Sequence, residues 1–290
     1  MMTNPAVPEV TMLTAPDGIQ LACRYLPGDG NLLVALHGFT GDGSTMVPLV
    51  EEVRNGRPAI VVDLVGHGKS QAPEHLEHYS MASVVDQILS VIGLHDPMTV
   101  HLIGYSLGGR VALSMAARAP WYFASLTLLS ATAGLADPAE RSARHDADIA
   151  SASHLLDIGL DAFVDEWLSL DLFESYVTGL TSDALQETKA QRRETDPVGL
   201  ANSLRGTGTG AMPPLWHLLA SIRSPVLAIA GSLDEKFSGL AVRIAESTKV
   251  GACEIIDGAG HVVHIENLSQ VASIVRPHLT KCESDEDHPS

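Results

Sequence analysis

Short, almost uninterrupted apolar runs recur along the chain, separated by longer stretches of mixed polarity. The runs are NLLVALHG, AIVVDLVGHG, MTVHLIGYS, SLTLLSAT, SPVLAIAGSLD and a shorter one, CEIIDGAGH. Continuous apolar strands are typical of a sheet that is covered on both faces. Helical patterns fall between them, near residues 44–54 and 80–94. Strands that alternate with helices predict an α/β protein with a mostly parallel, twisted sheet and right-handed crossovers.

The beginning, middle and end of the chain depart from this alternation. Residues 10–28 predict two strands around an Asp17–Gly18 turn, which is a hairpin signal. Residues 133–217 contain helical patterns but no clear strand, so we expect a helical cap inserted between two strands of the sheet. The core then comprises residues 1–132 and 218–280. We expect the acidic tail, residues 281–290, to be disordered.

Composition narrows the class of protein. The 290 residues are 45% hydrophobic, enough for one large core with a sub-domain. No apolar run approaches the roughly 18 residues of a membrane span, and the N-terminal residues lack the pattern of a secretory signal. Three widely spaced cysteines predict a reduced, cytoplasmic protein without metal-ligand spacing. The net charge of −17 argues against nucleic acid and anionic membranes as partners.

One serine, Ser106, lies at the junction of a predicted strand and a predicted helix. The segment GYSLG, residues 104–108, matches the G-x-S-x-G nucleophile elbow, where glycines allow a turn too tight for side chains. An ordinary glycine-rich turn with an incidental serine would fit the bare pentapeptide equally well. The strand before it and the helix after it favour the elbow, and with it the α/β-hydrolase fold.

A serine hydroxyl needs a base, and in this fold the acid and base follow in the order Ser, Asp, His. Asp234 ends one predicted strand and His261 lies in the loop after the last one, where such sheets place ligands. His261 would take the proton of Ser106, and Asp234 would fix its tautomer. His264 is the rival base. Asp63 is a rival acid, but it precedes the serine, and a turn or capping role suits it better.

The loop HGFTGDG, which follows the first core strand, is the predicted source of an oxyanion hole. In this fold one donor comes from that loop and the other from the residue after the nucleophile. We assign the two backbone N–H groups to Phe39 and Leu107. One such donor contributes roughly 3–4 kcal/mol in a measured case. His37, in the same loop, is expected to order the loop rather than act as a base, and we include it among the candidate substrate contacts.

The cap carries a distinctive string, GLANSLRGTGTGAMPPLWHLL, at residues 199–219. Its glycines at positions 206, 208 and 210 predict a flexible hinge, and Met212 and Trp216 are expected to line the string. Basic residues also accompany the catalytic motifs and the start of the cap. In so acidic a chain, this placement predicts a pocket for a multiply anionic ligand, although each residue alone fits a surface ion pair equally well. These residues are Arg110, Arg141, Arg144, Arg205 and Lys236.

Six segments together resemble the MenH family, the 2-succinyl-6-hydroxy-2,4-cyclohexadiene-1-carboxylate (SHCHC) synthases of menaquinone biosynthesis. They are LHGFTGDGSTM, DLVGHGKS, GYSLGGRVAL, LANSLRGTGTGAMPPLW, GSLDEKF and GAGHVVHIEN. The resemblance covers residues 36–267. The elbow and the triad order are common to all α/β-hydrolases. The GTGTG string before a tryptophan, the arginine after the elbow and the DEKF segment are more specific to this family.

The resemblance implies a reaction and a site. The family substrate is 2-succinyl-5-enolpyruvoyl-6-hydroxy-3-cyclohexene-1-carboxylate (SEPHCHC), which loses a ring proton and pyruvate to give SHCHC. The enzyme is then a lyase that needs no metal or organic cofactor, and its serine acts as a base. By resemblance the triad is Ser106, Asp234 and His261, Tyr105 and Trp216 lie at the pocket, and Arg110, Arg144 and Lys236 bind substrate carboxylates.

Three positions depart from the family pattern. Val65 replaces a usual proline, Met46 stands where an aromatic residue is common, and Met212 stands where glutamine is frequent. The last departure predicts an altered polarity of the pocket.

Two other classes of function share the same motifs. A carboxylesterase or C–C bond hydrolase would use the same triad to attack an acyl group. A non-catalytic binding protein of this fold is the third possibility, but the intact Ser, Asp, His order argues against it. The sequence sets no oligomeric state.

Overall fold

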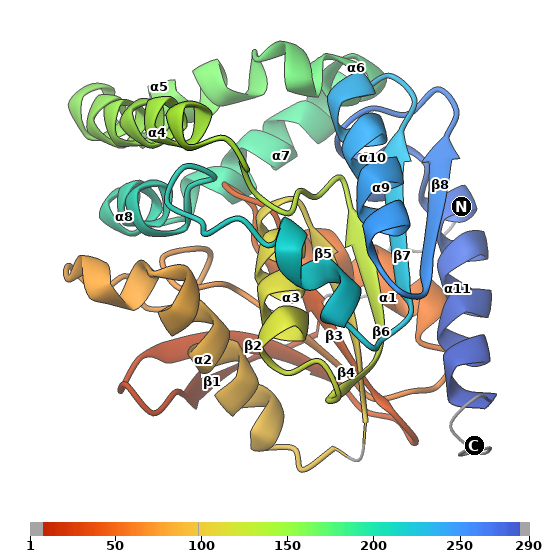
Figure 1. Cartoon of the computed structure of the whole chain (residues 1–290). Coiled ribbons are helices and arrows are strands. Elements are labelled where there is room, and N and C mark those ends of the chain that lie inside the picture. Colours follow the sequence, from red (N-terminus) through yellow and green to blue (C-terminus); the bar gives the residue numbers. More distant parts are fainter. Residues whose placement is uncertain (1–7, 98, 285–290) are drawn as a thin grey trace.

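The computed structural model describes residues 8–97 and 99–284. Within them an eight-stranded sheet runs in the order β1-β2-β4-β3-β5-β6-β7-β8 (Figure 1). Strand β2 pairs antiparallel with β1 and β4, and all other neighbours are parallel, which confirms the predicted mostly parallel sheet and the N-terminal hairpin. The strands are β1 (Val10–Thr14), β2 (Gln20–Leu26), β3 (Leu32–Leu36), β4 (Ala59–Val62), β5 (Val100–Tyr105), β6 (Phe123–Leu129), β7 (Val226–Gly231) and β8 (Gly251–Ile256).

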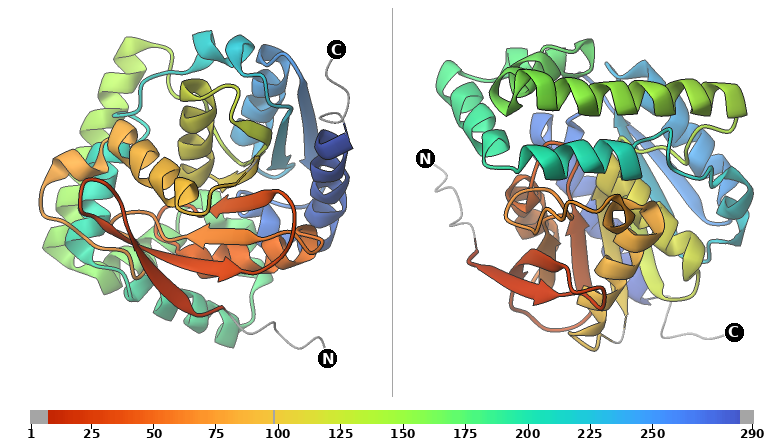
Figure 2. Two further views of the ribbon diagram at one scale, coloured as in Figure 1. Left: turned by 90° about the horizontal axis from the view of Figure 1, so that it is seen from below. Right: turned by 90° about the vertical axis from the view of Figure 1, so that its left-hand side faces the viewer.

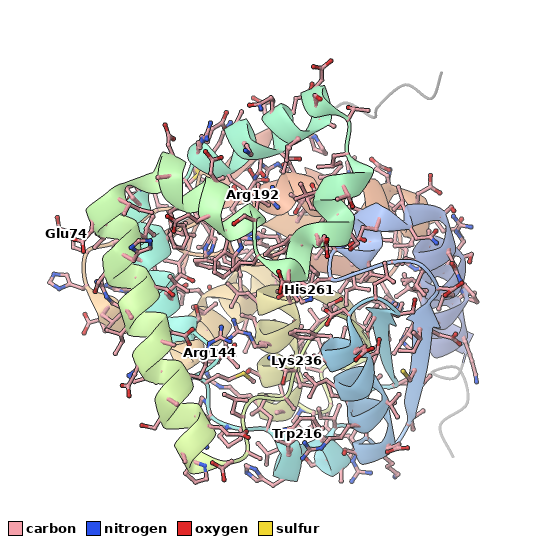
Figure 3. All side chains as sticks on the ribbon, turned by 90° about the horizontal axis from the view of Figure 1, so that it is seen from above. Glu74, Arg144, Arg192, Trp216, Lys236 and His261 are labelled. Carbon is pink, nitrogen blue, oxygen red and sulfur yellow. The ribbon has the colours of Figure 1, made fainter. Side chains whose placement is uncertain are left out.

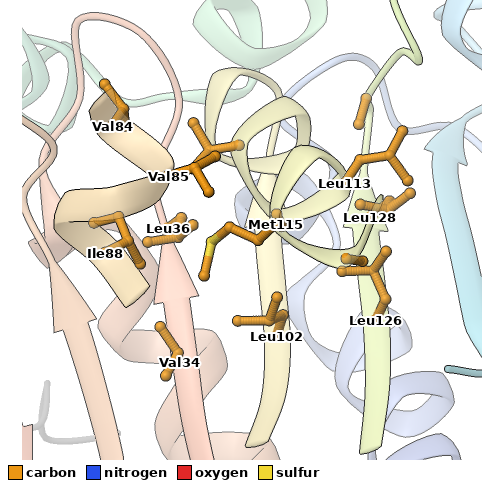
Figure 4. Packing of buried hydrophobic residues seen from close by; sticks show 14 of the residues in the cluster. Val34, Leu36, Val84, Val85, Ile88, Leu102, Leu113, Met115, Leu126 and Leu128 are labelled. Atoms are coloured by element: carbon orange, nitrogen blue, oxygen red, sulfur yellow. The ribbon is translucent and has the colours of Figure 1, made fainter. Parts of the chain in front are cut away.

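Helices cover both faces of the sheet. One face carries α2 (Met81–Gly93), α3 (Leu107–Arg118) and α9 (Glu235–Ser247), and the other carries α1 (Val47–Val53) and α11 (Leu268–Ser284). Side chains alternate between the two cores along each strand, as Leu36 and Ala35 of β3 do. Figure 4 shows part of the first core, with Leu36 between Ile88 of α2 and Met115 of α3, and Leu102 below Met115. Burial on both sides explains the uninterrupted apolar runs.

Five α-helices between β6 and β7 form a layer across the carboxyl ends of the strands (Figure 2, right). Residues 133–217, all of which the structure describes, contain no strand. Three of the helices share a small core of their own, which contains Leu155, Phe163 and Leu204. The helices are α4 (Pro138–Ile158), α5 (Leu160–Leu168), α6 (Glu174–Gly179), α7 (Ser182–Arg193) and α8 (Pro197–Thr207).

The glycines of the GTGTG string, which the sequence predicts to form a flexible hinge, lie where backbone segments pack closely. Gly206 lies inside α8, where a Cβ atom would be 2.4 Å from the carbonyl oxygen of Tyr79. A Cβ at Gly210 would be 2.1 Å from the backbone nitrogen of His145 on α4. Only glycine allows the backbones to approach this closely.

The C-terminal helix is longer than the sequence predicts, and the elements not yet named are short. Helix α11 continues through Ser284, so the start of the predicted disordered tail is helical, and residues 285–290 lie outside the described residues. No helix in the described part of the chain has the length and apolar character needed to cross a membrane. The short elements are η1 (Gly43–Met46), η2 (Leu76–Tyr79), η3 (Asp171–Phe173), η4 (Trp216–Ser221) and α10 (Val263–Glu266).

Candidate active site

Ser106 occupies a strained turn between β5 and α3. Its φ of 49° and ψ of −105° lie in a region that residues with a side chain rarely adopt. A Cβ at Gly104 would lie 2.4 Å from the Gly108 carbonyl oxygen, and a Cβ at Gly108 would lie 2.2 Å from that of Leu36. Both glycines are therefore required by the turn. Strain of this kind costs of order 1–3 kcal/mol and persists where the surrounding structure holds it.

The structure brings Ser106, His261 and Asp234 together. The Ser106 Oγ lies 3.2 Å from His261 Nε2, and His261 Nδ1 lies 2.7 Å from Asp234 Oδ2. Because an ionised carboxylate only accepts, Nδ1–H donates to Asp234 and Nε2 is left to accept from the serine hydroxyl. The other Asp234 oxygen accepts from the backbone N–H of Phe237 at 3.2 Å, in the first turn of α9. Both members of the His–Asp pair are buried.

The rival base, His264, lies against a different side chain. Its ring on α10 faces that of Tyr105, with the ring centroids 4.4 Å apart. Neither of its buried ring nitrogens has a hydrogen-bond partner within the described residues. Burial, together with the neighbouring His261, lowers the pKa of the His264 imidazole to about 3. His264 is therefore neutral and packed beneath the site.

The rival acid, Asp63, holds loops together instead of orienting a histidine. Its Oδ1 accepts from the Arg24 guanidinium at 2.5 Å and from the Gly43 N–H at 2.7 Å. Its Oδ2 accepts from the Lys69 N–H at 3.0 Å. These bonds compensate the cost of burying the Asp63 carboxylate, and none of them involves Ser106 or His261.

His37 is likewise structural, and the expectation that it contacts substrate is corrected. The side chain is fully buried and does not line the cavity described below. Its Nδ1–H donates to the Gly38 carbonyl at 2.7 Å, and its Nε2 accepts from the Leu64 N–H at 3.0 Å. Burial lowers the pKa of His37, which keeps Nε2 free to accept. His37 thus ties the loop that carries Phe39 to the loop after β4.

The two predicted oxyanion donors belong to residues that line the wall of the cavity described below. Phe39 and Leu107 both line the same cavity as Ser106. Leu107 is the first residue of α3, so its N–H lies among those that no carbonyl of the helix can satisfy. Neither amide N–H has an acceptor within the described part of the chain. Both are available to a developing negative charge, which the amino end of α3 also favours.

A cavity of about 1070 Å³ lies between the cap and the sheet. Ser106, His261 and Tyr105 line it from the core, and residues of α4, α5, α8 and α9 line other parts of its wall. Seen from above, His261 lies near the middle of the molecule, with Lys236 and Arg144 close to it (Figure 3). This volume is ample for a small organic ligand.

Three predicted cations line this cavity. Arg110 is buried, and one of its guanidinium N–H groups donates to the Thr207 carbonyl. Burial, together with the nearby charge of Arg144, lowers the pKa of Arg110 to about 10. Within the described residues no carboxylate forms an ion pair with Arg110 or with the exposed Lys236. Arg144 differs, because its Nε lies 2.7 Å from Asp148 Oδ1. A buried cation without a carboxylate partner is a strong site for an anionic ligand.

Other residues of the predicted pocket lie elsewhere. Arg141 donates to the Leu135 carbonyl and Arg205 to the Asn202 side chain, each at 3.1 Å, and neither lines the cavity. Met212 is fully buried in the core, so it does not alter the polarity of the cavity wall. Trp216 lines the cavity as predicted. Val65 and Met46, the other departures from the family pattern, are buried core residues.

Several lining residues were missed from the sequence. Trp167 of α5 packs edge-on against Phe39, and Phe237 packs edge-on against His261. Asp148 was detectable, because it lies four positions after Arg144 on one helix, the spacing of a helical ion pair. The aromatic residues and Arg243 belong to no motif that would have marked them. No group of three or more His, Cys, Asp or Glu side chains in the described ranges could hold a metal ion.

The strained serine, the buried His–Asp pair and the two available amides form a serine-hydrolase type of site on an α/β sheet. In agreement, the model of the α/β hydrolase fold family matches residues 31–268, and the chain belongs to this family.

Individual proteins similar to this chain place it in a more specific family within the α/β hydrolase fold. A Bacillus subtilis (strain 168) protein, named provisionally as 2-succinyl-6-hydroxy-2,4-cyclohexadiene-1-carboxylate synthase, is 36% identical over 269 residues, 92% of this chain and 97% of its own. The synthase of that name from Salmonella newport (strain SL254) is 29% identical over 89% of this chain and 100% of its own. The solved structure of MenH from S. aureus superposes with a TM-score of 0.84 at 30% identity, covering 90% of this chain and 98% of that one. The chain belongs to the MenH family, which confirms the resemblance read from its motifs.

Proposed function

We propose that the protein is an SHCHC synthase, a carbon–oxygen lyase of menaquinone biosynthesis that converts SEPHCHC to SHCHC and pyruvate. The observation that carries this proposal is the cavity that joins Ser106 and His261 to the cations Arg110, Arg144 and Lys236. These cations suit a substrate with several carboxylates, in a chain whose net charge is −17. The names of its relatives support the same reaction. The few, widely spaced cysteines support a cytoplasmic location.

The first step is removal of a proton from carbon. His261 Nε2 accepts the hydroxyl proton of Ser106, and the Ser106 oxygen takes the ring proton beside the succinyl ketone. The electron pair of the broken C–H bond moves onto the ketone oxygen. The N–H groups of Phe39 and Leu107 stabilise the resulting enolate, and the carboxylate of Asp234 stabilises the imidazolium of His261.

The second step expels the leaving group. The enolate re-forms the ketone as a C=C bond forms between ring carbons 2 and 3. The electron pair of the original bond between carbons 3 and 4 moves to carbons 4 and 5, and the C5–O bond to the enolpyruvyl group breaks. The departing enolpyruvate recovers the proton held by the Ser106–His261 pair and tautomerises to pyruvate. No water is consumed, and because Ser106 acts only as a base and forms no bond to carbon, no acyl-enzyme is formed.

The test is the Ser106→Ala variant in an assay coupled to the enzymes that supply SEPHCHC, following pyruvate and the diene absorbance. We expect product formation to be abolished while the circular dichroism and melting temperature stay near those of the wild type. Ser114→Ala is the matched control, because the Ser114 hydroxyl donates within α3 to the Arg110 carbonyl and lies outside the cavity. Pyruvate formation by folded Ser106→Ala at the wild-type rate would contradict the proposal.

A hydrolase would behave differently in the same experiment. It would release p-nitrophenol from p-nitrophenyl acetate with an initial burst and produce no pyruvate from SEPHCHC. That combination in the wild-type protein would favour the carboxylesterase alternative.

A further inference from the structure

Helix α9 contributes two cations to the wall of the cavity, Lys236 and Arg243. Arg243 lies seven positions after Lys236, which is about 10 Å further along the helix axis. Both side chains line the cavity and both residues are exposed to solvent, whereas Arg110 is only 8% exposed. Arg243 therefore lies where the cavity meets solvent, and we call this end the mouth of the cavity.

The Arg243 guanidinium is held on an aromatic surface. Its Cζ lies 3.7 Å from the centroid of the Trp216 ring, and the Trp216 Nε1–H donates to the Gly134 carbonyl at 2.8 Å. Stacking on a ring orients the planar guanidinium and leaves the N–H groups at its edge available for a carboxylate. No Asp or Glu within the described residues forms an ion pair with Arg243. The cation is thus oriented by Trp216 and has no acidic partner.

The surrounding charges make this cation important for an anionic ligand. Glu140 and Asp137, at the start of α4, also line the cavity. One oxygen of Asp137 accepts from the N–H groups of Ala139 and Glu140, at 2.8 and 2.9 Å. The amino end of α4 therefore offsets part of the negative charge of Asp137. The whole chain, with its net charge of −17, repels a polyanion at long range. A fixed cation at the mouth of the cavity offsets this repulsion locally.

We propose that Arg243, stacked on Trp216, forms an outer carboxylate subsite where a polycarboxylate substrate binds before it reaches Ser106. The identity of that substrate as SEPHCHC rests on the function proposed above. Arg243 is a capture and specificity residue in this scheme, distant from the reacting atoms. Its loss lowers the rate of productive association and leaves the bond-breaking steps intact.

The chain contains a matched control for this pair. Arg223 stacks over Trp121 with its Cζ 4.4 Å from the ring centroid, the same type of contact outside the catalytic cavity. The substitutions Arg243→Gln and Arg223→Gln each remove one positive charge and one stacked guanidinium. Only the first removes a cation from the mouth of the cavity.

The first experiment compares the kinetics of the two variants at low and high salt. For Arg243→Gln we expect kcat/KM to fall about 3- to 10-fold at low ionic strength while kcat stays within about twofold of the wild type. The difference should shrink as salt screens the exposed charge. Arg223→Gln should match the wild type. An unchanged kcat/KM for Arg243→Gln, or an equal loss for Arg223→Gln, would overturn the proposal.

A binding experiment separates this proposal from the proposed function. Calorimetric titration of the stable dicarboxylate 2-succinylbenzoate should give a Kd about 3- to 10-fold weaker for Arg243→Gln than for the wild type and Arg223→Gln. If the wild type released no pyruvate from SEPHCHC, the proposed function would fail while this titration still tested the subsite. Equal Kd values for all three proteins would overturn the outer subsite.

Discussion

Asp148 anchors Arg144 in the wall of the cavity that contains Ser106. The Arg144 Nε and the Asp148 Oδ1 are 2.7 Å apart on successive turns of α4, and the Asp148 Oδ2 accepts from the Gly210 N–H at 3.0 Å. One buried carboxylate therefore ties the arginine to the chain that follows α8. The Arg144 side chain is 41% exposed, so the rest of its guanidinium remains accessible to a ligand.

The substitution Asp148→Asn should weaken substrate binding more than catalysis. Without the carboxylate, Arg144 loses the partner that orients it, so we expect KM to rise several-fold with a smaller change in kcat. The lost charge-assisted bonds should also lower the free energy of unfolding, by about 1–2 kcal/mol. Steady-state kinetics and urea denaturation measure the two effects. Asp146→Asn, an exposed position on the same helix, is the control, and an unchanged KM in Asp148→Asn would contradict the anchoring role.

The substitution Arg144→Ala should separate anionic from neutral substrates. A charge-assisted hydrogen bond contributes roughly 1.5–3 kcal/mol, so we expect kcat/KM for SEPHCHC to fall at least about 10-fold. Any hydrolysis of p-nitrophenyl acetate, which carries no charge, should be nearly unchanged. Equal losses on both substrates would instead assign Arg144 a structural role.

The substitution Asp234→Asn should impair chemistry while preserving the fold. The amide can still accept from the Phe237 N–H, but it favours the wrong tautomer of His261 and no longer stabilises the imidazolium. By comparison with a serine protease triad, we expect kcat to fall about 10²–10⁴-fold. Asp63→Asn is the comparison, since it should lower the melting temperature more than kcat. If Asp63→Asn lowered kcat more than Asp234→Asn does, the assignment of Asp234 as the acid of the triad would be wrong.

The buried His264 should make stability depend on pH. Its folded pKa of about 3 lies below the ordinary value of 6.5, so the unfolded chain takes up a proton first as the pH falls. The stability it contributes is therefore complete above pH 6.5 and is lost progressively between pH 6.5 and about 3. From pH 7.5 to 5.5 the wild type should lose about 1.4 kcal/mol more than His264→Phe.

Urea denaturation at these two pH values measures that difference. Removal of the exposed His75 by His75→Phe controls for the loss of a histidine, and it should leave the wild-type pH dependence in place. The same pH dependence in His264→Phe and the wild type would show that His264 does not control this loss.

The substitution Gly210→Ala tests the packing of the GTGTG string. The added methyl would meet the His145 backbone on α4, so we expect a loss of about 1–3 kcal/mol in the free energy of unfolding. KM should rise as well, because α4 carries Arg144. Gly179→Ala, where a Cβ meets nothing within 4 Å, should be neutral or slightly stabilising. A flexible hinge at Gly210 would instead tolerate alanine.

The sequence by itself determined those features that depend on neighbouring residues. The apolar runs and helical patterns predict the mostly parallel sheet, because a strand buried on both faces leaves a continuous local signal. The elbow around Ser106 is equally local, since its turn excludes side chains at Gly104 and Gly108. The motifs indicate the MenH family in the same way, because each of them lies within one short stretch of sequence.

Only the tertiary structure decided which side chains meet. His261 and His264 are three positions apart, yet one accepts from Ser106 and the other packs beneath Tyr105. The burial of His37 and the stacking of Arg243 on Trp216 were equally hidden, because each contact joins segments far apart in the chain. Periodicity records which face of an element is buried. It carries no record of the partner on another element, which depends on how the cap and the sheet pack together.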